Sequence, residues 1–146
     1  MKSFRRKNSG IAAVESLIVL PVILLIFAAI VEFGTAFIRY NTLSKAVQNA
    51  VRYSISDVYG TLNPTAIANT TAIKNWVVYG QKQTPSSDDT SVKKTLDTIT
   101  LNDVSITVED DHVVVTATYT YMPMLNLLSM DTGLTFSSSA VMRTLQ

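Results

Sequence analysis

The sequence has no cysteine, a single histidine and little charge. Charged residues make up 16% of the 146 residues, whereas hydrophobic residues make up 47%. Without cysteine the chain can form no disulfide, no thiolate metal site and no cysteine nucleophile, and the redox compartment stays undetermined. A chain of this length can fold into one modest domain but not into two independent cores.

Positive charge is scarce beyond the first seven residues. That short start holds four of the twelve basic residues, and from Ile11 onward eight basic residues face eleven acidic ones, a net charge of −3. A faintly acidic remainder without a basic cluster gives no reason to expect a nucleic-acid partner. The four clustered basic residues are Lys2, Arg5, Arg6 and Lys7.

The apolar residues are concentrated near the N-terminus. Between Ile11 and Ile38 the only charged residues are Glu15 and Glu32, which flank a 16-residue uncharged run. As a helix, Ile11 to Val31 would span roughly 31 Å, about the thickness of the hydrocarbon layer. The basic residues before this segment predict a cytoplasmic N-terminus, with the rest of the chain outside.

A cleaved secretory signal is the alternative interpretation of this segment, because Gly34, Thr35 and Ala36 could form a small-x-small cleavage site before Phe37. Two features favour an anchor. Apolar positions at helical spacing continue to about Ser56, and Glu15 would be costly inside a membrane, at about 2.5–3.5 kcal/mol near its centre. The continuing stripe consists of Ala36, Tyr40, Leu43, Val47, Ala50 and Ser54, flanked by Phe37, Val51 and Ile55.

Gly10 and Glu15 bring the segment close to a known pattern. A short basic leader that ends in glycine, followed by an apolar helix with glutamate at its fifth position, resembles precursors cut by a prepilin peptidase. Cleavage between Gly10 and Ile11 would remove the basic residues and leave an α-amino group on Ile11. Glu15, one helical turn away, could then neutralise this amine in its own chain or in a neighbour.

The run GIAAVESLIVLPVILLIFAAIVEFGTAFIRY is similar to the N-terminal signature of TadE-like proteins, the pseudopilins of tight-adherence (Flp-type) pili. Ser16 departs from the aromatic residue typical of that family. The resemblance implies a minor pseudopilin that is matured by a prepilin peptidase and works with other pilins or pseudopilins, an inner-membrane assembly platform and membrane lipid. The matching residues are Gly10, Ala12, Ala13, Val14, Glu15, Leu17, Val19, Leu20, Pro21, Glu32, Phe33 and Gly34.

The three distinctive residues of the apolar run each have a simpler interpretation. Glu15 could be an acid that reaches back to the lipid headgroups, and Glu32 could lie at the outer interface. Pro21 removes one helical hydrogen bond, so we expect a bend or a locally re-satisfied backbone there. Because the basic leader and Gly10 precede Glu15, we favour a processing role for it. We also assign Glu15, Pro21 and Glu32 to helix assembly.

No constellation of residues indicates an enzyme, a metal site or a cofactor. His112 follows Glu109, Asp110 and Asp111, but consecutive residues in a tight turn cannot all face one ion, so a solvated hairpin turn is the better interpretation. The serine clusters lack a nucleophile-elbow context. We therefore expect a structural protein.

Beyond the long helix the pattern predicts an α+β domain. Asn63 and Pro64 predict the start of a second helix that ends at Tyr79 before Gly80, and residues 92–101 fit a short helix or a strand. Alternation predicts three antiparallel strands. They lie around Val104–Val108, at His112–Tyr121 and at Leu134–Met142, with turns at Asp110–Asp111 and Asp131–Gly133.

The expected organisation is a leader at 1–10, a membrane helix at 11–35, an amphipathic extension at 36–56 and an extracytoplasmic domain at 57–146. The amphipathic extension would cover the small sheet and also remain partly available to neighbouring subunits. The alternative function is a secreted or periplasmic binding module released after Ala36.

Overall fold

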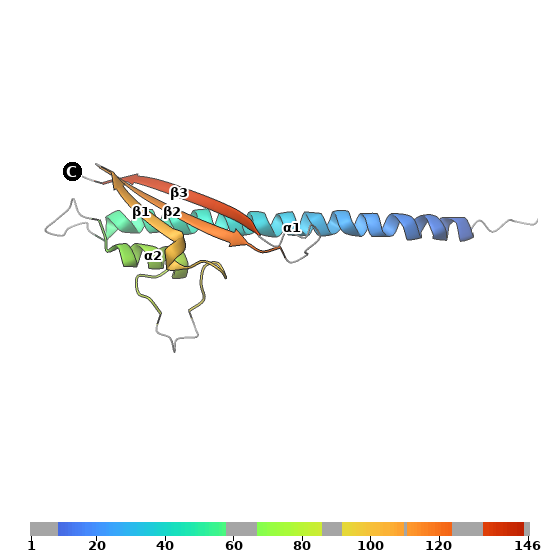
Figure 1. The fold of residues 1–146 in the computed structure, drawn as a ribbon, viewed down its shortest axis with the longest axis horizontal. Coiled ribbons are helices and arrows are strands. Elements are labelled where there is room, and N and C mark those ends of the chain that lie inside the picture. The colour runs from blue at the N-terminus through green and yellow to red at the C-terminus, as the bar shows by residue number, and fades with distance from the viewer. Residues whose placement is uncertain (1–8, 58–66, 86–91, 110, 124–132, 145–146) are drawn as a thin grey trace, which may run out of the picture. The chain divides into compact units, whose positions relative to one another are not determined.

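The computed structural model describes residues 9–57, 67–85, 92–109, 111–123 and 133–144. A long helix, a second helix and a three-stranded sheet follow one another along the chain, which confirms the expected α+β class (Figure 1). The chain divides into two compact units, residues 1–35 and residues 36–146. The elements are α1 (Ser9–Ser56), α2 (Thr70–Tyr79), the 3-10 helix η1 (Leu101–Asp103), β1 (Val104–Glu109), β2 (His112–Tyr121) and β3 (Leu134–Arg143).

Helix α1 ends at Ser56, as the continuing apolar stripe predicted. The far half of that stripe is buried in the second unit, where Leu43, Val47 and Ala50 have no exposed surface. The polar residues Lys45, Gln48 and Asn49 lie on the exposed side of the helix. A helix with one apolar and one polar side packs its apolar side on the core, and this segment does so.

The sheet has the order β1-β2-β3, and both pairs of neighbours are antiparallel. Alternation in β2 buries every second residue from Val113 to Tyr121, because successive strand side chains point to opposite faces. On the other face of the sheet, threonine and serine form cross-strand contacts, such as Thr116 Oγ1 to Ser139 Oγ at 3.0 Å. The predicted three-stranded meander is therefore confirmed.

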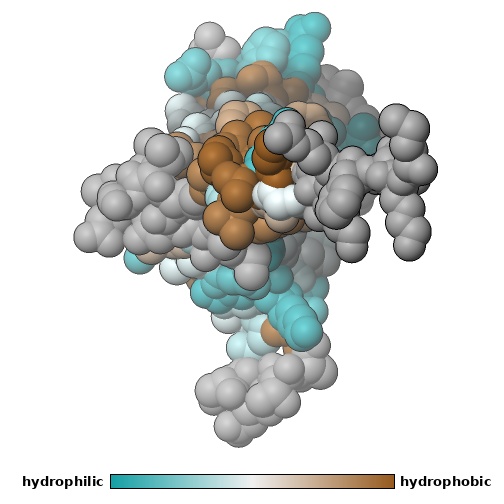
Figure 2. All heavy atoms as spheres, turned by 90° about the vertical axis from the view of Figure 1, so that its right-hand side faces the viewer, coloured by the Kyte–Doolittle hydropathy of each residue, from teal (hydrophilic) through white to brown (hydrophobic). Residues whose placement is uncertain are grey.

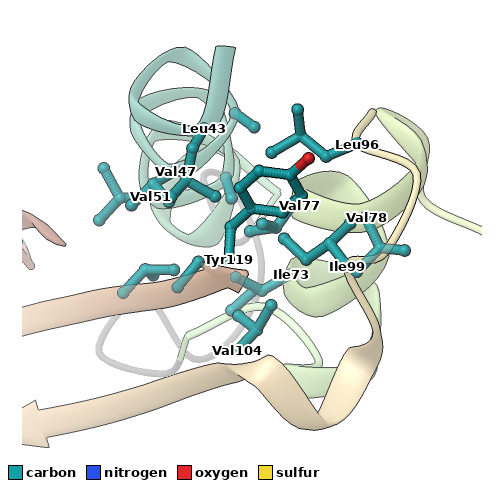
Figure 3. Packing of buried hydrophobic residues seen from close by; sticks show 14 of the residues in the cluster. Leu43, Val47, Val51, Ile73, Val77, Val78, Leu96, Ile99, Val104 and Tyr119 are labelled. Carbon is teal, nitrogen blue, oxygen red and sulfur yellow. The ribbon is translucent and has the colours of Figure 1, made fainter. Parts of the chain in front are cut away.

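One hydrophobic core joins the elements of the second unit. Tyr119 of β2 points toward the two helices, with Leu43 of α1 on one side and Val77 of α2 on the other (Figure 3). Near the end of α1 the rings of Tyr53 and Trp76 lie 5.3 Å apart between centroids, which links α1 to α2. A single sheet of this size needs such a covering layer to bury its apolar face.

The start of the second helix was predicted wrongly. Residues 67–69 are not helical, and α2 begins at Thr70, where the side chain of Asn69 accepts a hydrogen bond from the Thr71 amide at 2.8 Å. Asn69 is thus the N-cap, the role that the sequence interpretation had given to Asn63. The predicted stop is confirmed: Gly80 caps the helix with a φ of 68°, a left-handed conformation that glycine adopts without strain.

Residues 92–100 form neither the short helix nor the strand expected as alternatives, and Leu101 already belongs to η1. They run irregularly to η1, and the side chain of Asp103 accepts hydrogen bonds from the amide and hydroxyl of Thr100. Leu96 and Ile99 of this segment are nevertheless almost fully buried. Three predicted features lie outside the described residues. They are the basic residues of the leader, the helix start at Asn63–Pro64, and residues 131 and 132 of the turn before the last strand.

Candidate functional site

The first unit exposes a continuous apolar surface. Leu17 is 76% exposed, Leu24 57% and Phe27 63%. Hydrophobic side chains gather on the face shown in Figure 2, which is viewed from the side where α1 begins in Figure 1. Within the part of the chain that the structure describes, α1 alone is long and apolar enough to cross a membrane. Side chains this apolar need lipid or other helices around them.

The residues of the predicted processing site lie in the first turns of α1. Gly10 and Ile11 are helical and exposed, and a Cβ added at Gly10 would meet no atom within 4 Å. Glu15 is exposed one turn further along the helix. A four-residue separation places the Glu15 side chain on the same helix side as Ile11, which is the arrangement that a carboxylate–amine pair requires.

Three hydroxyl groups along α1 are satisfied within the helix. Ser16, Thr35 and Thr42 each bond to the carbonyl four residues earlier, every one at 2.9 Å. Such bonds allow polar side chains to lie in an apolar helix without an outside partner. Pro21 also lies inside α1, where it cannot donate to the carbonyl of Leu17.

The near half of the amphipathic stripe is partly exposed, although Ala36 packs against the core of the second unit; its use by neighbouring subunits stays a prediction. Phe37 is 64% exposed, Ile38 66% and Tyr40 39%, although the Tyr40 ring meets Phe136 of β3 at 6.0 Å between centroids. Aromatic and aliphatic side chains exposed on a helix are suited to packing against a partner helix.

An ion pair joins α1 to the segment after α2. Lys82 Nζ lies 2.9 Å from Asp57 Oδ1 and 5.9 Å from the centroid of the Tyr53 ring. The hydrogen bond from Lys82 holds the pKa of Asp57 below its ordinary value. Burial and then the nearby Asp57 raise the pKa of the Tyr53 phenol. These groups link the end of α1 to the segment after α2.

A second charged group lies at the β1–β2 turn. Asp111 pairs with His112 through Oδ1 and with Arg143 Nε through Oδ2, both at 2.6 Å. Burial acts to raise the pKa of Asp111, but Arg143 and His112 outweigh it and lower that pKa. His112 is thus partnered in the turn, and the described residues contain no group of three or more potential metal ligands. The sequence interpretation missed Arg143, which only the pairing of β2 with β3 brings to this turn.

Comparison with protein families identifies the amino-terminal part of the chain. Residues 10–52 match the family model described as TadE-like protein. This segment is similar to TadE-like proteins. The match begins at Gly10, and the segment contains Glu15, Pro21 and Glu32 as well as the first buried residues of the second unit, such as Leu43. No curated protein and no solved structure matches the chain.

The TadE-like segment supports a pilus-associated protein with an apolar N-terminal helix. Its residues 10–35 fit a single-pass membrane anchor, and its remaining residues enter the core of the second unit. The family match therefore covers two physically different stretches of α1. It does not extend to α2 or to the sheet, which the chain builds from residues outside the matched range.

Proposed function

We propose that this chain is a minor pilin or pseudopilin of a tight-adherence pilus, that a prepilin peptidase cuts it after Gly10, and that it primes or caps the pilus. The observation that carries the proposal is the TadE-like match from Gly10 onward, on a helix whose apolar side chains are exposed. The role is structural: the protein binds other subunits and lipid and catalyses no reaction.

Charge explains why the leader would be removed. The basic residues before Gly10 hold the precursor with its N-terminus in the cytoplasm, because positive residues stay on that side of a membrane. A leader with four positive charges would also oppose close packing of apolar helices. After cleavage only the α-amino group of Ile11 remains, and Glu15 of the same or a neighbouring chain neutralises it.

Helix packing supplies the assembly contact. Small residues at Ala12, Ala13, Ala28, Ala29 and Gly34 allow close approach of helices in a membrane, where dispersion contacts rather than the hydrophobic effect drive association. No heavy atom lies within 4 Å of a Cβ placed on Gly34, so a neighbouring backbone has room there. Glu32 lies near the outer end of the span, at the depth of the headgroups.

Mass spectrometry of the mature N-terminus tests the proposal. A chain that begins at Ile11 is expected when it is produced together with the prepilin peptidase of its own pilus system, and a chain that keeps Met1 is expected without that enzyme. A chain that begins at Phe37 would instead identify a signal-peptidase product and a released module, and would overturn the proposal.

Variants of Glu15 test its role separately. Glu15→Gln keeps the size of the side chain but removes the charge, so we expect normal membrane insertion with pilus assembly reduced about tenfold or more, as for an unpaired buried amine. The matched control is Ser16→Ala, whose hydroxyl bonds only within the helix. Assembly of Glu15→Gln at the parent level would show that the carboxylate has no part in it.

A further inference from the structure

The sheet has two open edges. Strand β2 is central, so β1 and β3 each present one row of backbone groups that pairs with no other strand in the described residues. An unpaired edge can accept another strand, and proteins commonly block such edges with lysine, proline or a bulge. Neither β1 nor β3 contains lysine or proline, and β3 carries no charge before Arg143.

The two edges carry opposite charges at the same level of the sheet. Glu109 pairs with His112 across β1 and β2, and His112 pairs with Arg143 across β2 and β3. These residues form one row on the hydroxyl-rich face, with the acid on one open edge and the base on the other. Asp111 accepts a hydrogen bond from Nε of Arg143. The Arg143 side chain is nevertheless 73% exposed, and its planar guanidinium carries two further terminal NH₂ groups that are donors.

Exposed apolar residues stand next to this row. Val108 belongs to the inward-facing set of β1 but is 52% exposed at the open edge, and Val141 on the opposite edge is 58% exposed. The register places Val108 level with Met142, and Thr107 level with Val141. If β3 of one copy lay beside β1 of another, Met142 would cover Val108 and Val141 would contact Thr107.

We propose that the open edge of β3 in one copy of this chain pairs in parallel with the open edge of β1 in a second copy, with Arg143 beside Glu109. Both strands run antiparallel to β2, so they share one direction, and six residues, Ser138–Arg143, lie alongside Val104–Glu109. Pairing β3 with β3 would bring no edge acid of the second copy to Arg143, which would keep only Asp111 of its own chain, and pairing β1 with β1 would bring no edge base to Glu109. Charge therefore selects the head-to-tail pair.

A head-to-tail contact can repeat from copy to copy without closing, which a two-fold contact cannot. Copies related in this way keep the same strand direction from one copy to the next. A shared strand direction agrees with subunits that are anchored in one membrane, and this agreement rests on the proposed function. The edge pairing itself depends only on the second unit.

Disulfide trapping in the full-length chain tests the pairing, since the sequence has no cysteine of its own. Thr107→Cys and Val141→Cys are produced together in one membrane as two singly substituted chains. Neighbouring strands lie about 4.8 Å apart, within disulfide range, whereas two strand spacings within one chain, about 9.6 Å, are beyond it. We expect a disulfide-linked dimer from the mixture and none from either variant alone.

The off-register control is Ser105→Cys in place of Thr107→Cys, and it should give at least fivefold less dimer with Val141→Cys. A dimer of Val141→Cys with itself, equal trapping by Ser105→Cys, or no dimer in the mixture would each overturn the proposal. Adding Arg143→Glu should lower trapping about fivefold, and Glu109→Arg on the partner should restore it, whereas Asp111→Asn should not lower it.

The N-terminus of the trapped chains is determined by mass spectrometry in the same sample. Chains that begin at Ile11 but give no dimer would overturn the edge pairing and leave the proposed function standing. Chains that begin at Phe37 and still give the dimer would overturn the proposed function and leave the edge pairing standing.

Discussion

Residues 11–35 and residues 36–56 of α1 are both rich in aliphatic side chains, but they differ in what surrounds them. Leu24 in the first stretch is 57% exposed, whereas Leu43 in the second has no exposed surface. The second stretch finds its apolar neighbours in α2 and the sheet of the same chain. The first stretch must find its apolar neighbours in lipid or in other subunits. The same residue type therefore contributes to folding in the second stretch and to association in the first.

Truncating one leucine in each stretch should lower the free energy of unfolding for the second stretch but not for the first. Leu43→Ala is expected to lower the free energy of unfolding by about 2–5 kcal/mol, because it leaves a cavity in a packed core. Leu24→Ala should leave that free energy unchanged, because the Leu24 side chain is exposed and belongs to no packed core. Urea unfolding of the full chain in detergent, followed by circular dichroism, measures both. Equal losses would show that the two stretches do not differ in this way.

A positive charge should be harmful in the first stretch of α1 and harmless on the exposed side of the second. Leu24→Arg should weaken membrane insertion by about 2.5–3.5 kcal/mol, because a charged side chain is costly at the centre of a span. The fraction of chain that resists alkaline extraction of membranes measures this. Gln48→Arg, on the exposed side of the second stretch, is the control and should extract like the parent. Full retention of Leu24→Arg would argue against a membrane span.

Acid should lower the stability of the second unit, and this is the smallest of the three expected effects. The pKa of Asp111 is lower in the folded chain than in the unfolded one, so its contribution to stability is present at neutral pH and is lost as pH falls through the folded pKa. The Tm of the parent should fall between about pH 5 and pH 2, and that of Asp111→Asn should fall less. Parallel Tm curves for the two proteins would mean that the ion pairs of Asp111 do not stabilise the fold.

The sequence predicted what depends on local periodicity. The alternation of β2 and the helical spacing from Ala36 to Ser54 each repeat over several residues, and both elements form where expected. Helix α2 was harder, because Asn63 and Asn69 are both good N-caps and local chemistry does not choose between them. Burial of Ile73 and Val77 against the sheet accompanies the later start.

Long-range pairing was beyond prediction. Leu96 and Ile99 enter the core from a segment with no periodicity, so no pattern marked them. The row of Glu109, His112 and Arg143 depends on the register of three strands. The short β1–β2 turn indicates the pairing of Glu109 with His112. The register of β3, and with it the position of Arg143, depends on a connection of twelve residues from Met122 to Gly133. The processing role of Glu15 remains a prediction.

The aromatic pair at the end of α1 gives the protein a built-in reporter. Trp76 is the chain's single tryptophan, it is half-buried, and its ring lies against Tyr53. Its fluorescence therefore comes entirely from the second unit and receives nothing from the membrane stretch. Emission that shifts to longer wavelength signals that α1 and α2 have separated, even in lipid vesicles, so opening of this unit can be followed by light while the anchor stays inserted.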